Sequence, residues 1–132
     1  ENQLPFLQTI FGSRFRIIPI MIGEVSPRVF TNLITEFIDP NDLVVICAEL
    51  SYENPVYLAK EMDDRANKAV QSLLTAKIEQ LKSQIKNALL LEIAIEIAIK
   101  NKWNPRLLDY RAGKTADNTQ MVTGYTSIEF YE

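Results

Sequence analysis

The sequence predicts an α/β fold, a layered sheet with helices on both of its faces. Two apolar runs, 15–22 and 43–47, are too short for helices and are typical of buried strands. Apolar residues with helical spacing lie between them, so the order strand, helix, strand indicates a parallel α/β unit. With 132 residues, 47% of them hydrophobic, the chain has the size of one domain around one core, which we place at 1–132.

The first three elements carry recognisable boundaries. The run 15–22 is rich in β-branched residues and ends before Gly23, and Pro19 within it indicates a strand edge or a bulge. Ser26 and Pro27 are typical of an N-cap and a first helical residue, and the helical pattern that follows should stop near 39–40. The second apolar run, 43–47, then predicts a core strand.

The second half of the chain predicts helices followed by a final strand. Residues 57–81 have the pattern of one or two amphipathic helices, with Met62, Ala66, Ala69, Val70, Leu73 and Leu74 on one face. Segment 85–99 is apolar almost all round, with one stripe formed by Glu92, Glu96 and Lys100, so other structure should enclose it. A short strand is expected at 107–110, a polar loop at 112–120 and the last strand at 121–131.

Composition bears on the partners and the cellular compartment to expect. The net charge of −3 provides no positive field for a phosphate backbone, so we expect no nucleic-acid partner. Glu92 and Glu96 interrupt the longest apolar stretch, which is also too short to cross a bilayer, and no signal-peptide pattern is present. The single cysteine, Cys47, lies in an apolar run and should be a small buried hydrophobe. Together these features favour a cytoplasmic protein without membrane association.

The chain contains no histidine. Histidine is the commonest general base near neutral pH and a common nitrogen ligand for iron, copper and zinc. The usual catalytic triads and facial metal triads are therefore excluded within this chain. We predict no catalytic residues, no metal ligands and no cofactor here, which favours a chain that is not an enzyme by itself.

Several motifs, in the same order and spacing, resemble the Memo family, also called AmmeMemoRadiSam system protein B. They are Glu-Asn-Gln-Leu-Pro-Phe-Leu-Gln at 1–8, Phe-Arg-Ile-Ile-Pro-Ile at 15–20, the apolar strand ending at 45–52, and the closing segments 107–113 and 122–128. The resemblance implies a fold related to the class III extradiol dioxygenases, the LigB-like fold. It also implies that this chain corresponds to the carboxy-terminal half of a domain about twice as long, whose other half supplies two histidines.

The resemblance implies where the family's site would lie in this chain. Where the family has Ser-Ser-Asp-x-Ser-His, this sequence has Glu49 in place of aspartate and Tyr52 in place of histidine. Lys86 occupies the position of a family cysteine at the start of the last long helix. Glu49, Tyr52 and Lys86 are thus degenerate site positions, and a protonated lysine cannot ligate a metal.

Three interpretations of these residues stay open. Lys86 could take over the metal's positive charge and pair with Glu49, which would leave a filled, inert pocket. With a lowered pKa it could instead act as a base or a Schiff-base amine, with Tyr52 as an acid. The simplest interpretation is that all three are solvated. The nearby carboxylates Glu61, Asp63 and Asp64 lack the pattern of a calcium loop and are expected on a solvated helix face.

Three functions of different classes follow. The first is a non-catalytic Memo-like module, a pseudoenzyme that acts through association with another chain, as a homo-oligomer or in a heteromeric complex that supplies the missing half. The alternative is a subunit of a metalloenzyme whose histidine ligands for iron or copper come from a missing or separate chain. A weaker option is a regulatory module that binds a small molecule in the vacated cleft. A half-sheet would expose an apolar edge that proteins normally cover, which favours assembly.

Overall fold

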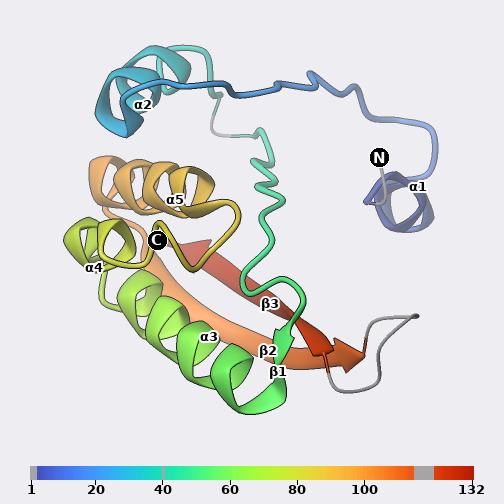
Figure 1. Ribbon diagram of the computed structural model, residues 1–132. Helices are drawn as coiled ribbons and strands as arrows, with labels where there is room; N and C mark the ends of the chain where they lie inside the picture. Colours follow the sequence, from blue (N-terminus) through green and yellow to red (C-terminus); the bar gives the residue numbers. More distant parts are fainter. Residues whose placement is uncertain (1–2, 40, 115–120) are drawn as a thin grey trace.

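The computed structural model confirms a mixed α/β fold and describes residues 3–39, 41–114 and 121–132 (Figure 1). Its elements are α1 (Leu4–Phe11), α2 (Pro27–Ile34), β1 (Asn54–Pro55), α3 (Val56–Gln71), α4 (Thr75–Glu79), α5 (Ala88–Asn101), β2 (Asn104–Lys114) and β3 (Met121–Tyr131). No helix among the described residues is long and apolar enough to cross a bilayer. Most of the expected loop 112–120 lies outside the described residues, and its first three residues belong to β2.

The sheet has three antiparallel strands in the order β1-β3-β2. β2 and β3 form a long ribbon whose register runs from Asn104 opposite Tyr131 to Lys114 opposite Val122, with an irregularity between Leu107 and Asp109. β1 adds only a two-residue pairing at the start of β3. The last strand occupies the predicted residues 121–131, whereas β2 is longer than the predicted 107–110 because it pairs with β3 along its whole length.

The core lies between the helices and one face of the sheet. α3 packs along β2 and β3, and α4 and α5 pack beside it (Figure 1). Buried residues of all three helices meet Tyr110, Ile128 and Phe130 from the strands. The sequence predicts helices on both faces, but in the described part of the chain the helical layer covers one face. Side chains such as Arg106 and Tyr125 on the strands stay exposed.

The predicted helices are present. Ser26 occupies the N-cap of α2 and Pro27 its first turn, although the serine hydroxyl makes no capping hydrogen bond and the helix ends at Ile34, before the expected 39–40. The segment 57–81 forms two helices, α3 and α4, as the pattern allowed. α5 is enclosed as predicted, because its side chains are buried on nearly every side, including Glu92.

The two predicted strands near the beginning of the chain are not formed. Segments 14–23 and 42–50 have neither helix nor strand pairing. Most apolar side chains of 14–23 and 42–47 are exposed, with Ile18 86% and Met21 97% accessible, whereas Leu50 is buried in the core and Ala48 packs against it. In Figure 1 both run as open trace between the helices, and α1 lies apart from the core. A strand exists only where a neighbour accepts and donates its backbone hydrogen bonds, and these segments find no such neighbour. The predicted parallel unit is therefore not formed by residues 3–39 and 41–114.

Candidate functional site

The segment leading to Tyr52 is fixed by one buried carboxylate. Asp63, on α3, is 0% exposed, and its Oδ1 accepts a hydrogen bond from the Ser51 backbone N–H at 2.8 Å. Its Oδ2 accepts from the Ser51 hydroxyl at 2.9 Å and from the Tyr110 hydroxyl at 2.8 Å. Gly124 lies against the same carboxylate, and its N–H donates to the Ser51 carbonyl at 3.2 Å. We call these four residues the Asp63 latch, since they join α3, β2, β3 and the chain before β1.

The expectation of a solvated Asp63 is therefore wrong. Glu61 is exposed and Asp64 half-buried, but Asp63 shares a helical face with Ala59, Ala66 and Val70, which are all buried. That spacing of three and four residues was the available signal in the sequence. A buried carboxylate requires hydrogen-bond donors, and Ser51 and Tyr110 provide them from distant parts of the chain.

The structure brings Glu49, Tyr52 and Lys86 together. Lys86 Nζ lies 2.6 Å from Glu49 Oε2 and 4.3 Å from the centre of the Tyr52 ring. The backbone supports this arrangement, because the Lys86 N–H donates to the Leu50 carbonyl and the Glu49 N–H donates to the Asn87 side chain. The pairing of Lys86 with Glu49, one of the three interpretations left open above, is present in the structure.

The chemistry of this cluster is that of a half-exposed ion pair. The hydrogen bond that Lys86 donates to Glu49 raises the pKa of Lys86, so the amine stays protonated at neutral pH. The interpretation of Lys86 as a lowered-pKa base is therefore contradicted. The pKa of Tyr52 is raised as well, mainly by its hydrogen bond with Glu53. About half of the Lys86 side chain remains accessible, and such surface pairs add at most about 1 kcal/mol of stability.

These residues do not fit the metal that the family resemblance implies. An ammonium group has no lone pair to donate, and here it occupies one oxygen of Glu49. Among residues 3–39, 41–114 and 121–132, no three His, Cys, Asp or Glu side chains come close enough to hold a metal ion. Cys47 lies outside this cluster and is exposed, contrary to the expectation of burial, because the segment that carries it has no strand neighbour.

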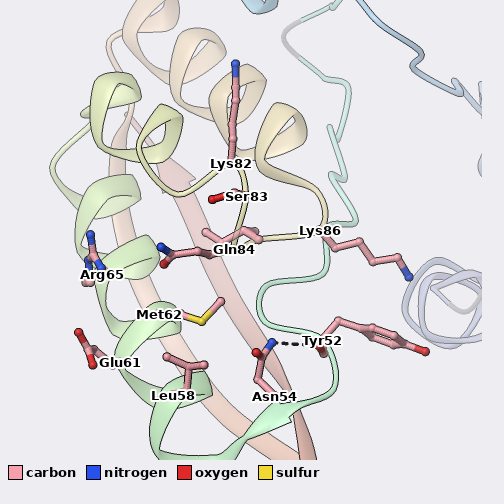
Figure 2. A pocket seen from close by; sticks show the side chains of 11 residues that line it. Tyr52, Asn54, Leu58, Glu61, Met62, Arg65, Lys82, Ser83, Gln84 and Lys86 are labelled. Atoms are coloured by element: carbon pink, nitrogen blue, oxygen red, sulfur yellow. Dashed lines mark hydrogen bonds between the residues drawn. The ribbon is translucent and has the colours of Figure 1, made fainter.

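A pocket of about 640 Å³ lies beside the cluster, between α3 and the turn that precedes α5. Figure 2 shows Leu58 and Met62 directed from α3 toward Asn54 and Gln84 across it. Tyr52 and Lys86 form one edge, but their side chains point away from the interior (Figure 2). No sequence pattern predicts this pocket, because its walls come from separate elements and carry no spacing motif.

A buried carboxylate lies close to the same turn. Glu92, on α5, is 4% exposed, and Lys82 Nζ is 3.6 Å from its Oε1, while Lys82 also pairs with Glu79 on the surface. Desolvation is the main cause that raises the pKa of Glu92 above its ordinary value of 4.5. The ionised form of Glu92 therefore weakens the fold.

We expect Glu92→Gln to increase stability at pH 7. A raised pKa means that the native state binds more protons than the unfolded state just above pH 4.5, so stability falls as the pH rises through that window. Glutamine carries no charge, so the variant avoids the cost of burying an ionised carboxylate. Its gain in free energy of unfolding over the parent should become smaller as the pH is lowered from 7 to 4.5. Urea unfolding of both proteins at the two pH values measures the difference. The same difference in free energy of unfolding at both pH values would contradict the prediction. Glu96→Gln, on the same helix, is the control.

Comparison with known proteins gives three matches. A MEMO1 family protein of Sulfolobus acidocaldarius is 28% identical over 141 residues, covering 98% of this chain and 50% of the relative. One of Sulfurisphaera tokodaii is 23% identical over 145 residues, again covering 98% and 50%. One of Saccharolobus solfataricus is 28% identical over 80 residues, or 55% of this chain and 28% of the relative. This chain thus spans about half the length of the two relatives that it matches throughout.

No family model and no solved structure matches the chain. The similarity is weak, but in two relatives it extends over nearly all of this sequence. It agrees with the resemblance carried by the motifs, while the relation to extradiol dioxygenases stays a prediction. The chain is accordingly Memo-like, a distant homologue of MEMO1 family proteins over nearly its whole length.

Proposed function

We propose that this chain is a non-catalytic Memo-like module that acts by completing a larger assembly with another polypeptide. The observation that carries the proposal is the pair of extended apolar segments, 14–23 and 42–47, which lack strand neighbours. We call them the open segments. Their patterns are typical of buried strands, yet Ile18 and Met21 are almost fully accessible. Burying such side chains stabilises an interface by roughly 25 cal/mol per Å² of apolar surface.

The required partner is a polypeptide that pairs with these segments. Strand pairing would satisfy their free backbone groups and cover their side chains, as at other sheet edges. The relatives supply an independent argument, since about half of their length has no counterpart here. We propose that the partner contributes that half of the sheet, either as a different chain or as the remainder of a longer one, and that copies of this chain associate when it is absent.

The apolar surface is concentrated in the same part of the chain. α1 exposes Phe6 and Ile10, and α2 exposes Val29 and Leu33. Exposed apolar surface of this extent favours contact with another polypeptide. The single thiol, Cys47, lies in an open segment and is exposed. The Lys86–Glu49 ion pair supports the non-catalytic part of the proposal, because it occupies the place where the family resemblance implies a metal site.

The test is sedimentation equilibrium of the whole chain over a concentration series. We expect a mass above that of one chain, and Ile18→Glu should lower it, because a charge in an open segment cannot be buried at a strand interface. Ile18 is 86% exposed, so the substitution removes no core contact. Tyr57→Glu, at a similarly exposed position on α3, is the matched control and should leave the mass unchanged.

Two results would overturn the proposal. One is a folded monomer that unfolds cooperatively at every concentration tested. The other is stoichiometric iron or copper in the purified assembly, measured by elemental analysis, which would favour the alternative of a metalloenzyme subunit with ligands from a second chain.

A further inference from the structure

A second pocket carries a strong local charge that no part of the proposed function uses. It has a volume of about 280 Å³ and lies between the later turns of α3 and α4. Arg65 and Lys68 line it from α3, and Lys77 lines it from α4. The chain as a whole has a net charge of −3, yet no carboxylate lines this pocket. We call it the basic pocket.

The three cations are available for a ligand. Within the described part of the chain, Arg65, Lys68 and Lys77 form no ion pair. Glu61 and Asp64 lie one helical turn before Arg65 and Lys68, but neither is paired with them. Like charges held around one small volume repel each other, and an anion between them removes that repulsion.

The remaining walls of the basic pocket indicate the shape of the anion. Ser72 and Gln80 add neutral hydrogen-bond donors, so the polar side offers guanidinium, ammonium, hydroxyl and amide groups together. Ala69, Leu74 and Leu81 form an apolar floor, and Leu74 is about half exposed. A ligand that fits both sides has a compact, doubly charged head and a short apolar body.

We propose that the basic pocket binds a small organic phosphate. The phosphate would lie between Arg65, Lys68 and Lys77, where charge-assisted hydrogen bonds are strongest, and the organic part would cover Leu74. A volume of about 280 Å³ is near the lower limit of ligand sites, which suits a small ester better than a nucleotide. The residues that line the basic pocket lie outside the open segments, so phosphate binding does not require the chain to assemble.

The test is calorimetric titration of the whole chain with inorganic phosphate and with butyl phosphate, at constant ionic strength. We expect both to bind, and butyl phosphate to bind several-fold more tightly because its alkyl group covers the apolar floor. Lys77→Gln and Lys68→Gln should each weaken binding about tenfold, a loss of roughly 1.4 kcal/mol. Lys60→Gln makes the same charge change on α3 outside both pockets and should leave the affinity unchanged.

One further variant and one competitor test the apolar contribution to binding and the class of ligand. Leu74→Ser should abolish the advantage of butyl phosphate and retain the binding of inorganic phosphate. Absence of binding, or equal weakening in all three lysine variants, would overturn the proposal, because general screening would then explain the effect. Tighter binding of an oligo-glutamate peptide that displaces phosphate would overturn it in favour of an acidic polypeptide. The sedimentation experiment does not depend on any of these results.

Discussion

Gly124→Ala should destabilise the fold by about 3 kcal/mol or more, because the new methyl group has no space. A Cβ at this position would lie 1.7 Å from Oδ2 and 2.5 Å from Cγ of Asp63. The carboxylate cannot move aside, since three hydrogen bonds from Ser51 and Tyr110 hold it. Urea unfolding followed by circular dichroism measures the loss.

Gly113→Ala is the matched control, because it makes the same change on the neighbouring strand β2. Its Cβ would meet only the Tyr125 ring, at 3.1 Å, and that side chain is 59% exposed and free to turn away. We expect a change of less than about 0.5 kcal/mol. Equal stability of Gly124→Ala and the parent protein would contradict the close approach of β3 to α3.

Asp63→Ala should cost about 3 kcal/mol through a different mechanism. The change removes the acceptor of three hydrogen bonds, and bonds to a charged group contribute roughly 1.5–3 kcal/mol each, with less than full additivity. The Ser51 hydroxyl would remain buried without its partner. Because the latch holds the chain before Tyr52, we also expect the Lys86–Glu49 pair to lose its fixed geometry.

Asp64→Ala is the control, since Asp64 is adjacent, half-buried and without a hydrogen bond or ion pair in the described part of the chain. It should change the free energy of unfolding by less than about 1 kcal/mol. The double variant Asp63→Ala and Gly124→Ala should be less destabilised than the sum of the single changes, because the shorter side chain removes the clash. Strict additivity of the two effects would show that the residues do not touch.

The helices and the last strand could be predicted because their signals are local. Ser26 and Pro27 mark the start of α2, and the apolar spacing within α3 and α5 decides which faces are buried. The strands at 15–22 and 43–47 could not be predicted correctly for this chain from pattern alone. Their apolar residues suit a buried sheet, but the neighbour that would complete that sheet is not among the described residues.

The candidate site was predicted in part. The family resemblance brought Glu49, Tyr52 and Lys86 to one place, and the ion pair agrees with their charges. The burial of Asp63 depends on Ser51, Tyr110 and Gly124, which are up to 61 positions away along the chain, so helical spacing provided the only local signal. Both pockets arise where helices meet other elements, a relation that only the packed structure defines.

Hydrogen exchange measured by mass spectrometry tests the central claim most directly, because it reports whether the backbone amides of the open segments 14–23 and 42–47 are paired. In the whole protein at concentrations where it assembles, we expect both segments to be protected, and dilution or Ile18→Glu should return them to rapid exchange while α3 and α5 stay protected. Rapid exchange of both segments at every concentration, with an intact core, would contradict the claim that this chain works by completing a larger sheet.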